Sequence, residues 1–158
     1  MNLNNKIEPS LELKISNWEL DFYSRPIIES NGKKRWELII CSKSSYKTKD
    51  LFLWNKKCPA NEVNSVWLTK ALNEAINEAK KQGWAKPSVV RFWRTSMKSI
   101  IKKSLEAVSI EALVSRRTYD LLDRIEFLEK EIYPKEKGYV RGVLAPTCLL
   151  YTSDAADD

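Results

Sequence analysis

Residues 18–42 read WELDFYSRPIIESNGKKRWELIICS and carry the clearest secondary-structure signals of the chain. In residues 18–25 apolar and polar side chains alternate, which is typical of a β-strand with one buried face. Residues 35–42 predict a second strand. Asn31-Gly32 lies between the two, and both residues tolerate the positive φ of a type I′ turn. The stretch therefore predicts an antiparallel hairpin.

The rest of the chain adds one more strand and then alternates helices with strands. The predicted elements are a strand over 51–54, a helix from an Asn61 cap to Gln82, a strand over 88–93, a helix capped by Thr95 or Ser96, a strand over 110–114, and a helix from a Ser115 cap to Tyr133-Pro134. The order β-β-β-α-β-α-β-α predicts a mixed α/β (α+β) fold with a ribonuclease-H-like order of elements. A ferredoxin-like arrangement is the alternative.

Composition indicates a globular domain of ordinary size. The chain has 158 residues, of which 43% are hydrophobic and 30% charged. It holds no run of about 18 apolar residues, so no membrane span is expected. Residues 1–16 form a polar lead-in without the apolar stretch of a secretory signal, and we expect a cytoplasmic location.

The last eleven residues differ from the rest of the chain. CLLYTSDAADD, residues 148–158, has no basic residue and resembles the translation of a transposase-type sequencing adaptor. We expect it to be read-through, with the natural protein continuing beyond Thr147 into a C-terminal domain that is missing. Without its three aspartates, 18 acidic residues stand against 27 basic ones, a net charge of +9. Such a charge favours a polyanionic partner.

The absence of histidine excludes several chemistries. Without it, a zinc site of the usual Cys/His type and a Ser–His or Cys–His nucleophile pair cannot form. Cys41 and Cys58, the two cysteines before the tail, do not form a CxxC motif. We therefore expect no metal site.

The ribonuclease-H-like order raises the question of a nuclease that uses two Mg²⁺ ions held by carboxylates. Glu19 and Asp21 lie on the first predicted strand. The first helix and its approach add three glutamates: Glu62, Glu74 and Glu78. The fourth predicted strand, however, carries Arg91 and Arg94, whose charges would repel metal ions. A solvated or ion-paired strand face is the favoured interpretation of Glu19 and Asp21.

Basic and aromatic residues around the fourth strand indicate nucleic-acid binding. Arg91, Trp93 and Arg94 lie at the strand end, and the following helix adds three lysines: Lys98, Lys102 and Lys103. Arginine and lysine neutralise phosphates, while aromatic rings stack on unpaired bases. The alternative is a solvated helix face with Trp93 in the core. It is favoured for Lys102 and Lys103 and equally weighted for Arg91, Trp93 and Arg94.

Arg116 and Arg117 are predicted in the first turn of the third helix. Positive charge is unfavourable there, and a bound phosphate would reverse that penalty. An equally weighted alternative is a salt bridge to Asp120, Asp123 or the Glu19 and Asp21 face.

Five segments together resemble one protein family. They are WELDFYSRPI (18–27), GKKRWELIIC (32–41), CPANEVNSVWLTKALNEAI (58–76), VVRFWRTSM (89–97) and SRRTYDLL (115–122). The family is that of the Atab-two-like RNA-binding proteins, the cyanobacterial and chloroplast factors for translation of the photosystem I psaB message. The resemblance covers residues 17–143, the N-terminal half of the family's usual length.

The resemblance implies binding of A/U-rich single-stranded RNA, a role in translation and photosystem assembly, and neither enzyme activity nor a cofactor. It implies a cytoplasmic location in cyanobacteria and a chloroplast location in plants, with translation or photosystem assembly proteins as further partners. Within the matching segments, the residues predicted to bind RNA are Arg25, Arg91, Trp93, Arg94, Arg116, Arg117 and Tyr119. A Mg²⁺-dependent or decayed nuclease and a scaffold for a protein partner are the alternatives.

Overall fold

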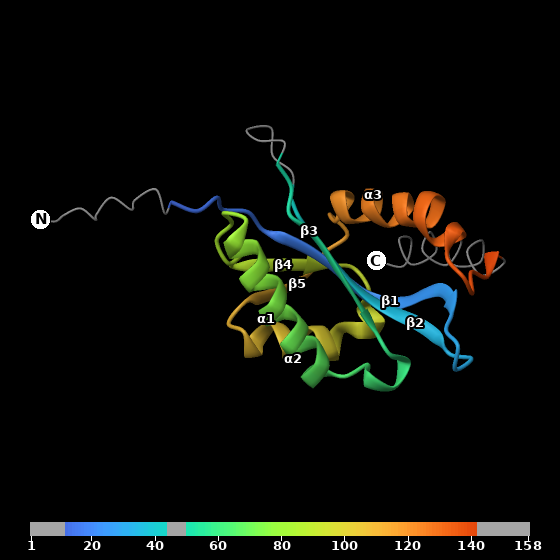
Figure 1. The fold of residues 1–158 in the computed structure, drawn as a ribbon. Helices are drawn as coiled ribbons and strands as arrows, with labels where there is room; N and C mark the ends of the chain where they lie inside the picture. Colours follow the sequence, from blue (N-terminus) through green and yellow to red (C-terminus); the bar gives the residue numbers. More distant parts are fainter. Residues whose placement is uncertain (1–11, 44–49, 142–158) are drawn as a thin grey trace, which may run out of the picture.

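The computed structural model describes residues 12–43 and 50–141 (Figure 1). The strands are β1 (Trp18–Ile28), β2 (Lys34–Ser42), β3 (Leu53–Cys58), β4 (Val89–Phe92) and β5 (Glu111–Val114). The helices are α1 (Ser65–Lys81), α2 (Lys98–Ala107) and α3 (Tyr119–Phe127). The predicted mixed α/β class and the predicted order of elements are confirmed.

The strands form one sheet in the order β3-β2-β1-β4-β5. β2 runs antiparallel to both β1 and β3, whereas β1, β4 and β5 run parallel to one another. Helix α1 lies between β3 and β4 in the chain, and α2 lies between β4 and β5. The parallel half of the sheet excludes the ferredoxin-like alternative, whose neighbouring strands would be antiparallel.

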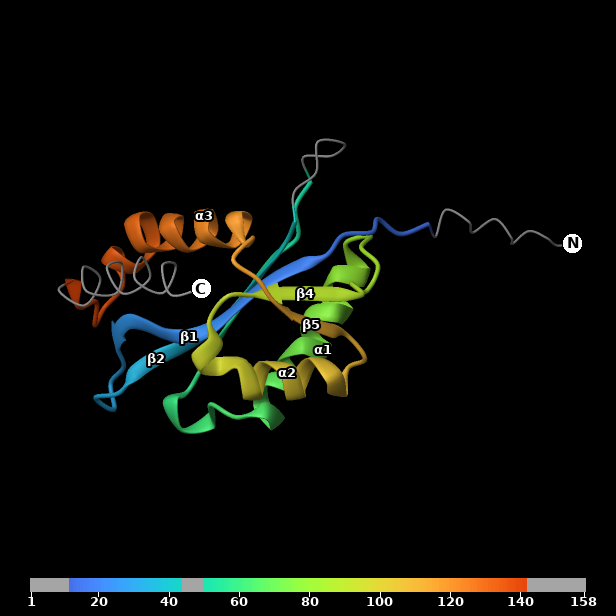
Figure 2. The ribbon, with the colours of Figure 1, turned by 180° about the vertical axis from the view of Figure 1, so that it is seen from behind.

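Helices cover both faces of the sheet, with α1 and α2 on one face and α3 on the other (Figures 1 and 2). The alternation in β1 sorts its side chains between these layers. Trp18, Leu20 and Phe22 belong to the larger core with α1 and α2. Glu19 and Asp21 point to the opposite face, where they are 1% exposed. These carboxylates are therefore buried rather than solvated, and the ion-paired form of the prediction is confirmed for Asp21, which pairs with Arg25 and Arg94.

The hairpin between β1 and β2 forms as predicted, but its turn is of another type. Gly32 has a φ of +83°, whereas Asn31 is not among the residues with positive φ, so the turn is not type I′. Gly32 N donates to Glu29 O at 2.9 Å, and Glu29 N donates to Lys33 O at 2.8 Å. This is a three-residue loop in which glycine takes the left-handed position.

Three helices begin at other residues than the sequence predicted. The cap of α1 is Asn64, whose side chain accepts from Trp67 N, whereas Asn61 lies in a preceding 3-10 turn. Neither Thr95 nor Ser96 caps α2, because both lie in a 3-10 turn, Thr95–Met97, before it. Helix α3 begins at Tyr119 rather than after Ser115.

Some predictions from the sequence concern segments outside the described residues. These are the tail over residues 148–158 and most of the lead-in over residues 1–16. No helix in residues 12–43 or 50–141 is long and apolar enough to cross a membrane.

Candidate nucleic-acid interface

Asp21 is the centre of a buried ion-pair network. Its carboxylate, 0% exposed, accepts hydrogen bonds from Arg25 Nη1 at 3.0 Å and from Arg94 Nε and Nη2 at 2.8 and 3.1 Å. Burial by itself raises the pKa of Asp21, but Arg94 and Arg25 outweigh it and hold the pKa at about 2. Asp21 is therefore charged at neutral pH and fixes both arginines.

The same network accounts for three of the predicted RNA-binding residues. Arg25 is 4% exposed and also donates to Glu37 O at 3.0 Å. The Arg94 guanidinium lies 3.7 Å from the ring centre of Tyr23 and 4.2 Å from that of Trp93. Trp93 packs against the core below α3. RNA contact by Arg25, Trp93 and Arg94 stays a prediction, and the geometry gives these residues partners inside the protein.

Glu19 occupies the start of α3. Its Oε1 accepts from Leu121 N at 2.9 Å, so a carboxylate from β1 caps a helix 102 residues further along the chain. Burial raises the pKa of Glu19, although the Leu121 N–H and the charge of Arg91 act in the opposite direction. A side chain of the protein itself therefore caps this helix end, where the sequence predicted a bound phosphate. Phosphate binding by Arg116 and Arg117 stays a prediction.

Arg116 and Arg117 lie before α3 rather than in its first turn. Ser115 Oγ accepts from Arg117 N at 3.0 Å and so stabilises a turn, while Thr118 is the residue that precedes the helix. Ser115 N donates to Phe92 O at 2.9 Å, which ties this turn to the end of β4. Figure 2 shows the connection from β5 crossing to the α3 side of the sheet.

The structure thus brings four of the seven predicted RNA-binding residues to one region, which we call the β4–α3 surface: Arg91, Arg116, Arg117 and Tyr119. Tyr119 is 63% exposed, Arg117 is exposed, and Arg91 and Arg116 are half-buried. Arg91 is opposite Glu19 in β1 and opposite Leu113 in β5, so strand pairing on both sides fixes the position of its backbone. This surface combines positive charge with an open aromatic ring.

The carboxylates expected of a nuclease do not converge. Glu19 and Asp21 face α3, whereas Glu74 on α1 pairs with Lys56 at 2.5 Å and Glu78 accepts from Gln82 Nε2 at 2.8 Å. The sheet separates the two sets (Figure 1). Within the described ranges, the structure contains no group of three or more His, Cys, Asp or Glu side chains that could hold a metal ion.

The sequence reasoning missed the outer face of α1. Two hollows flank this helix, and uncharged polar residues at every fourth position line one of them. That spacing was visible in the sequence as Ser65, Thr69, Asn73 and Asn77.

Comparison with known proteins agrees with this fold. A chain in the cryo-EM structure of the simian T-cell lymphotropic virus intasome in complex with PP2A regulatory subunit B56 gamma superposes with a TM-score of 0.52. The match covers 78% of this chain and 41% of that chain. At 12% sequence identity, this similarity shows the fold alone.

Sequence comparison gives nearer relatives. "Protein TAB2 homolog, chloroplastic" from Zea mays is 34% identical over 148 residues, or 87% of this chain and 36% of the relative. The protein of the same name from Arabidopsis thaliana is 34% identical over 131 residues, or 82% of this chain and 33% of the relative. The chain therefore spans about a third of the length of these relatives.

A family model matches residues 17–127, which contain the sheet, α1, α2 and α3. Its description is "RNA-binding protein Tab2/Atab2 N terminal". The chain therefore belongs to the Tab2/Atab2 family of RNA-binding proteins and matches its N-terminal part.

Proposed function

We propose that this domain binds single-stranded RNA through the β4–α3 surface and catalyses no reaction. The observation that carries the proposal is the exposure of Arg117 and Tyr119 on the connection that the Ser115 N–Phe92 O hydrogen bond ties to the end of β4, the strand of Arg91. Arginine side chains neutralise backbone phosphates, and an open tyrosine ring stacks on an unpaired base. The family description and the excess of basic over acidic residues support this function.

The biological role we propose is support of photosystem I message translation and photosystem assembly, with A/U-rich leader RNA as the target. The names of the maize and Arabidopsis relatives place those proteins in the chloroplast. For this chain we propose the cytoplasm of a cyanobacterium. Translation factors or photosystem assembly proteins are the further partners that this role requires.

A fluorescence-anisotropy titration of the 158-residue chain with A/U-rich single-stranded RNA tests the function. Affinity should fall steeply with salt, with a slope of about −0.7 for each phosphate neutralised. Arg117→Ala/Tyr119→Ala should weaken binding by about tenfold or more, because a stacked base and a phosphate contact are lost. Arg141→Ala/Phe127→Ala removes the same kinds of exposed side chain elsewhere and should bind as the parent does.

The alternatives give different results in the same titration. RNA that is cut only when Mg²⁺ is present would contradict the non-catalytic proposal. If the folded chain does not bind RNA at any salt concentration, the RNA-binding proposal fails. A scaffold function then gains support from Leu113 and Val114, apolar residues 38% and 41% exposed on the edge strand β5, which suit a protein partner.

A further inference from the structure

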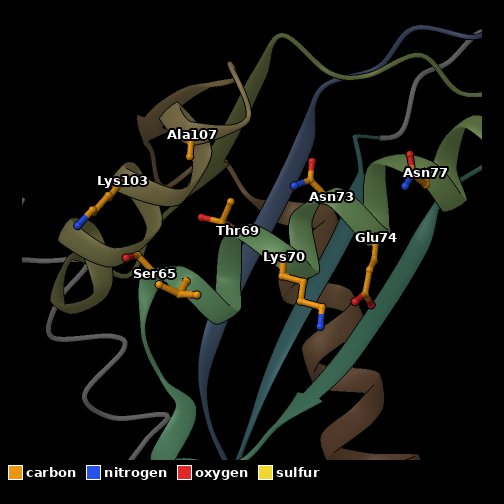
Figure 3. Close-up of a pocket in the computed structure, with 9 residues that line it drawn as sticks. Ser65, Thr69, Lys70, Asn73, Glu74, Asn77, Lys103 and Ala107 are labelled. Atoms are coloured by element: carbon orange, nitrogen blue, oxygen red, sulfur yellow. The ribbon is translucent and has the colours of Figure 1, made fainter.

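Two hollows lie side by side on the outer face of α1. The larger, with a volume of about 580 Å³, lies between α1 and α2 (Figure 3). The smaller, of about 290 Å³, lies between α1 and β3 and includes Lys56 and Trp67. Val66 and Lys70 line both hollows, so a single extended ligand could cross the helix from one to the other.

The larger hollow has a strip of uncharged polar side chains. Ser65, Thr69, Asn73 and Asn77 follow at every fourth position of α1, and this spacing puts them on one face of a helix. Figure 3 shows them along α1, with Lys103 and Ala107 of α2 across from the start of the strip. A carboxamide both donates and accepts hydrogen bonds, as the edges of nucleobases do.

Positive charge flanks the strip. Lys70 and Lys103 line the larger hollow and are exposed. Its one acidic lining residue, Glu74, forms an ion pair with Lys56, so its charge is offset within the protein. The arrangement suits a ligand with polar, uncharged groups joined to phosphates.

The ridge between the hollows offers apolar surface. Val66, the second residue of α1, is 79% exposed and lines both hollows. Next to it, Trp67 is half-buried and stacks on Phe22, with 5.4 Å between the two ring centres. Lys56 Nζ lies 5.9 Å from the centre of the Trp67 ring. Sugars and base faces can pack on such a ridge.

We propose that the outer face of α1 is a second contact surface for the RNA strand, with bases hydrogen-bonded by Thr69, Asn73 and Asn77 and phosphates held by Lys70 and Lys103. This inference rests on the proposed RNA binding and adds the place where bases are contacted. The surface lies on the opposite side of the sheet from the β4–α3 surface (Figures 1 and 2). The two surfaces can therefore be disabled separately.

The test compares RNA with abasic RNA of the same length in the full 158-residue chain. Asn73→Ala/Asn77→Ala should weaken binding of base-containing RNA about tenfold and leave abasic RNA almost unaffected, because only base contacts are lost. Asn31→Ala removes an exposed carboxamide outside both hollows and is the control. Thermal unfolding of each variant confirms that it is folded.

A charge variant gives the second arm. Lys70→Glu/Lys103→Glu should weaken both RNAs and make the salt slope shallower by at least about one, since two phosphate contacts are lost. Lys135→Glu/Lys137→Glu makes the same charge change at exposed positions away from α1 and should have a much smaller effect. Crosslinking of 4-thiouridine RNA should yield adducts within residues 65–77.

The outcomes separate this inference from the proposed function. Parent-like binding by both α1 variants, together with loss in Arg117→Ala/Tyr119→Ala, would leave RNA on the β4–α3 surface alone and overturn the α1 surface. If the folded parent binds no RNA, both proposals fail. A protein that competes for the hollows while RNA does not would likewise overturn the inference.

Discussion

Replacing Asp21 by asparagine keeps the shape of a fully buried side chain and removes its charge. In the parent protein this carboxylate compensates two guanidiniums, those of Arg25 and Arg94, which are 4% and 13% exposed. The asparagine oxygen can still accept a hydrogen bond, but its NH₂ group replaces the second acceptor oxygen and faces guanidinium donors. The variant therefore removes the carboxylate that is directly bonded to both buried guanidiniums.

Removing one partner of a buried ion pair costs about 3–5 kcal/mol. Because Arg94 retains some contact with water, we expect the lower end, about 3 kcal/mol. For a chain of this size that corresponds to a fall in Tm of roughly 6–12 °C. Adding Arg94→Met to Asp21→Asn removes one uncompensated cation and should recover part of the loss.

Urea unfolding followed by circular dichroism measures the change in the free energy of unfolding. The control is Glu126→Gln, which breaks an exposed ion pair to Lys130 and should have little effect. The pH dependence gives a second signature. Because the pKa of Asp21 falls from 3.8 to about 2 on folding, its contribution is complete above pH 4 and is lost as the pH drops towards 2. An Asp21→Asn protein as stable as the parent at pH 7 would refute the ion-pair reasoning.

Three residues, Glu19, Gly138 and Cys41, give further predictions. Glu19→Ala should lower the free energy of unfolding by about 1 kcal/mol, because Leu121 N loses its cap; Glu19→Gln should retain the cap. Since the pKa of Glu19 is raised, the parent should lose stability as the pH rises above 4.5, and Glu19→Gln, followed by urea unfolding across pH, should flatten that loss. Gly138→Ala should destabilise by more than about 1 kcal/mol in the same assay, since φ is +90° and a Cβ would meet Ile28 O at 2.2 Å. Burial raises the pKa of Cys41, so peptide mapping after brief alkylation should find it labelled only in denaturant; rapid labelling of native protein would contradict its burial.

The sequence predicted the sheet and its helices because these depend on local periodicity. Alternation over residues 18–25 and 35–42, the glycine at 32, and the helical spacing up to Gly83 each reflect backbone geometry within a few residues. The class and order of elements follow from such signals in sequence. Turn type and helix starts were less secure, since Asn61 and Asn64 are equally good caps on local grounds.

The roles of the polar residues of β1 depend on the tertiary structure. Alternation put Glu19 and Asp21 on the face away from the main core, but α3, about 100 residues later, covers that face and buries them. Burying a charge requires a partner, and the partners come from three distant places: Arg25, Arg94 and the N–H of Leu121. The arginines that the sequence predicted to bind RNA were thus divided between internal pairing and the open surface by packing between distant segments, which no local pattern records.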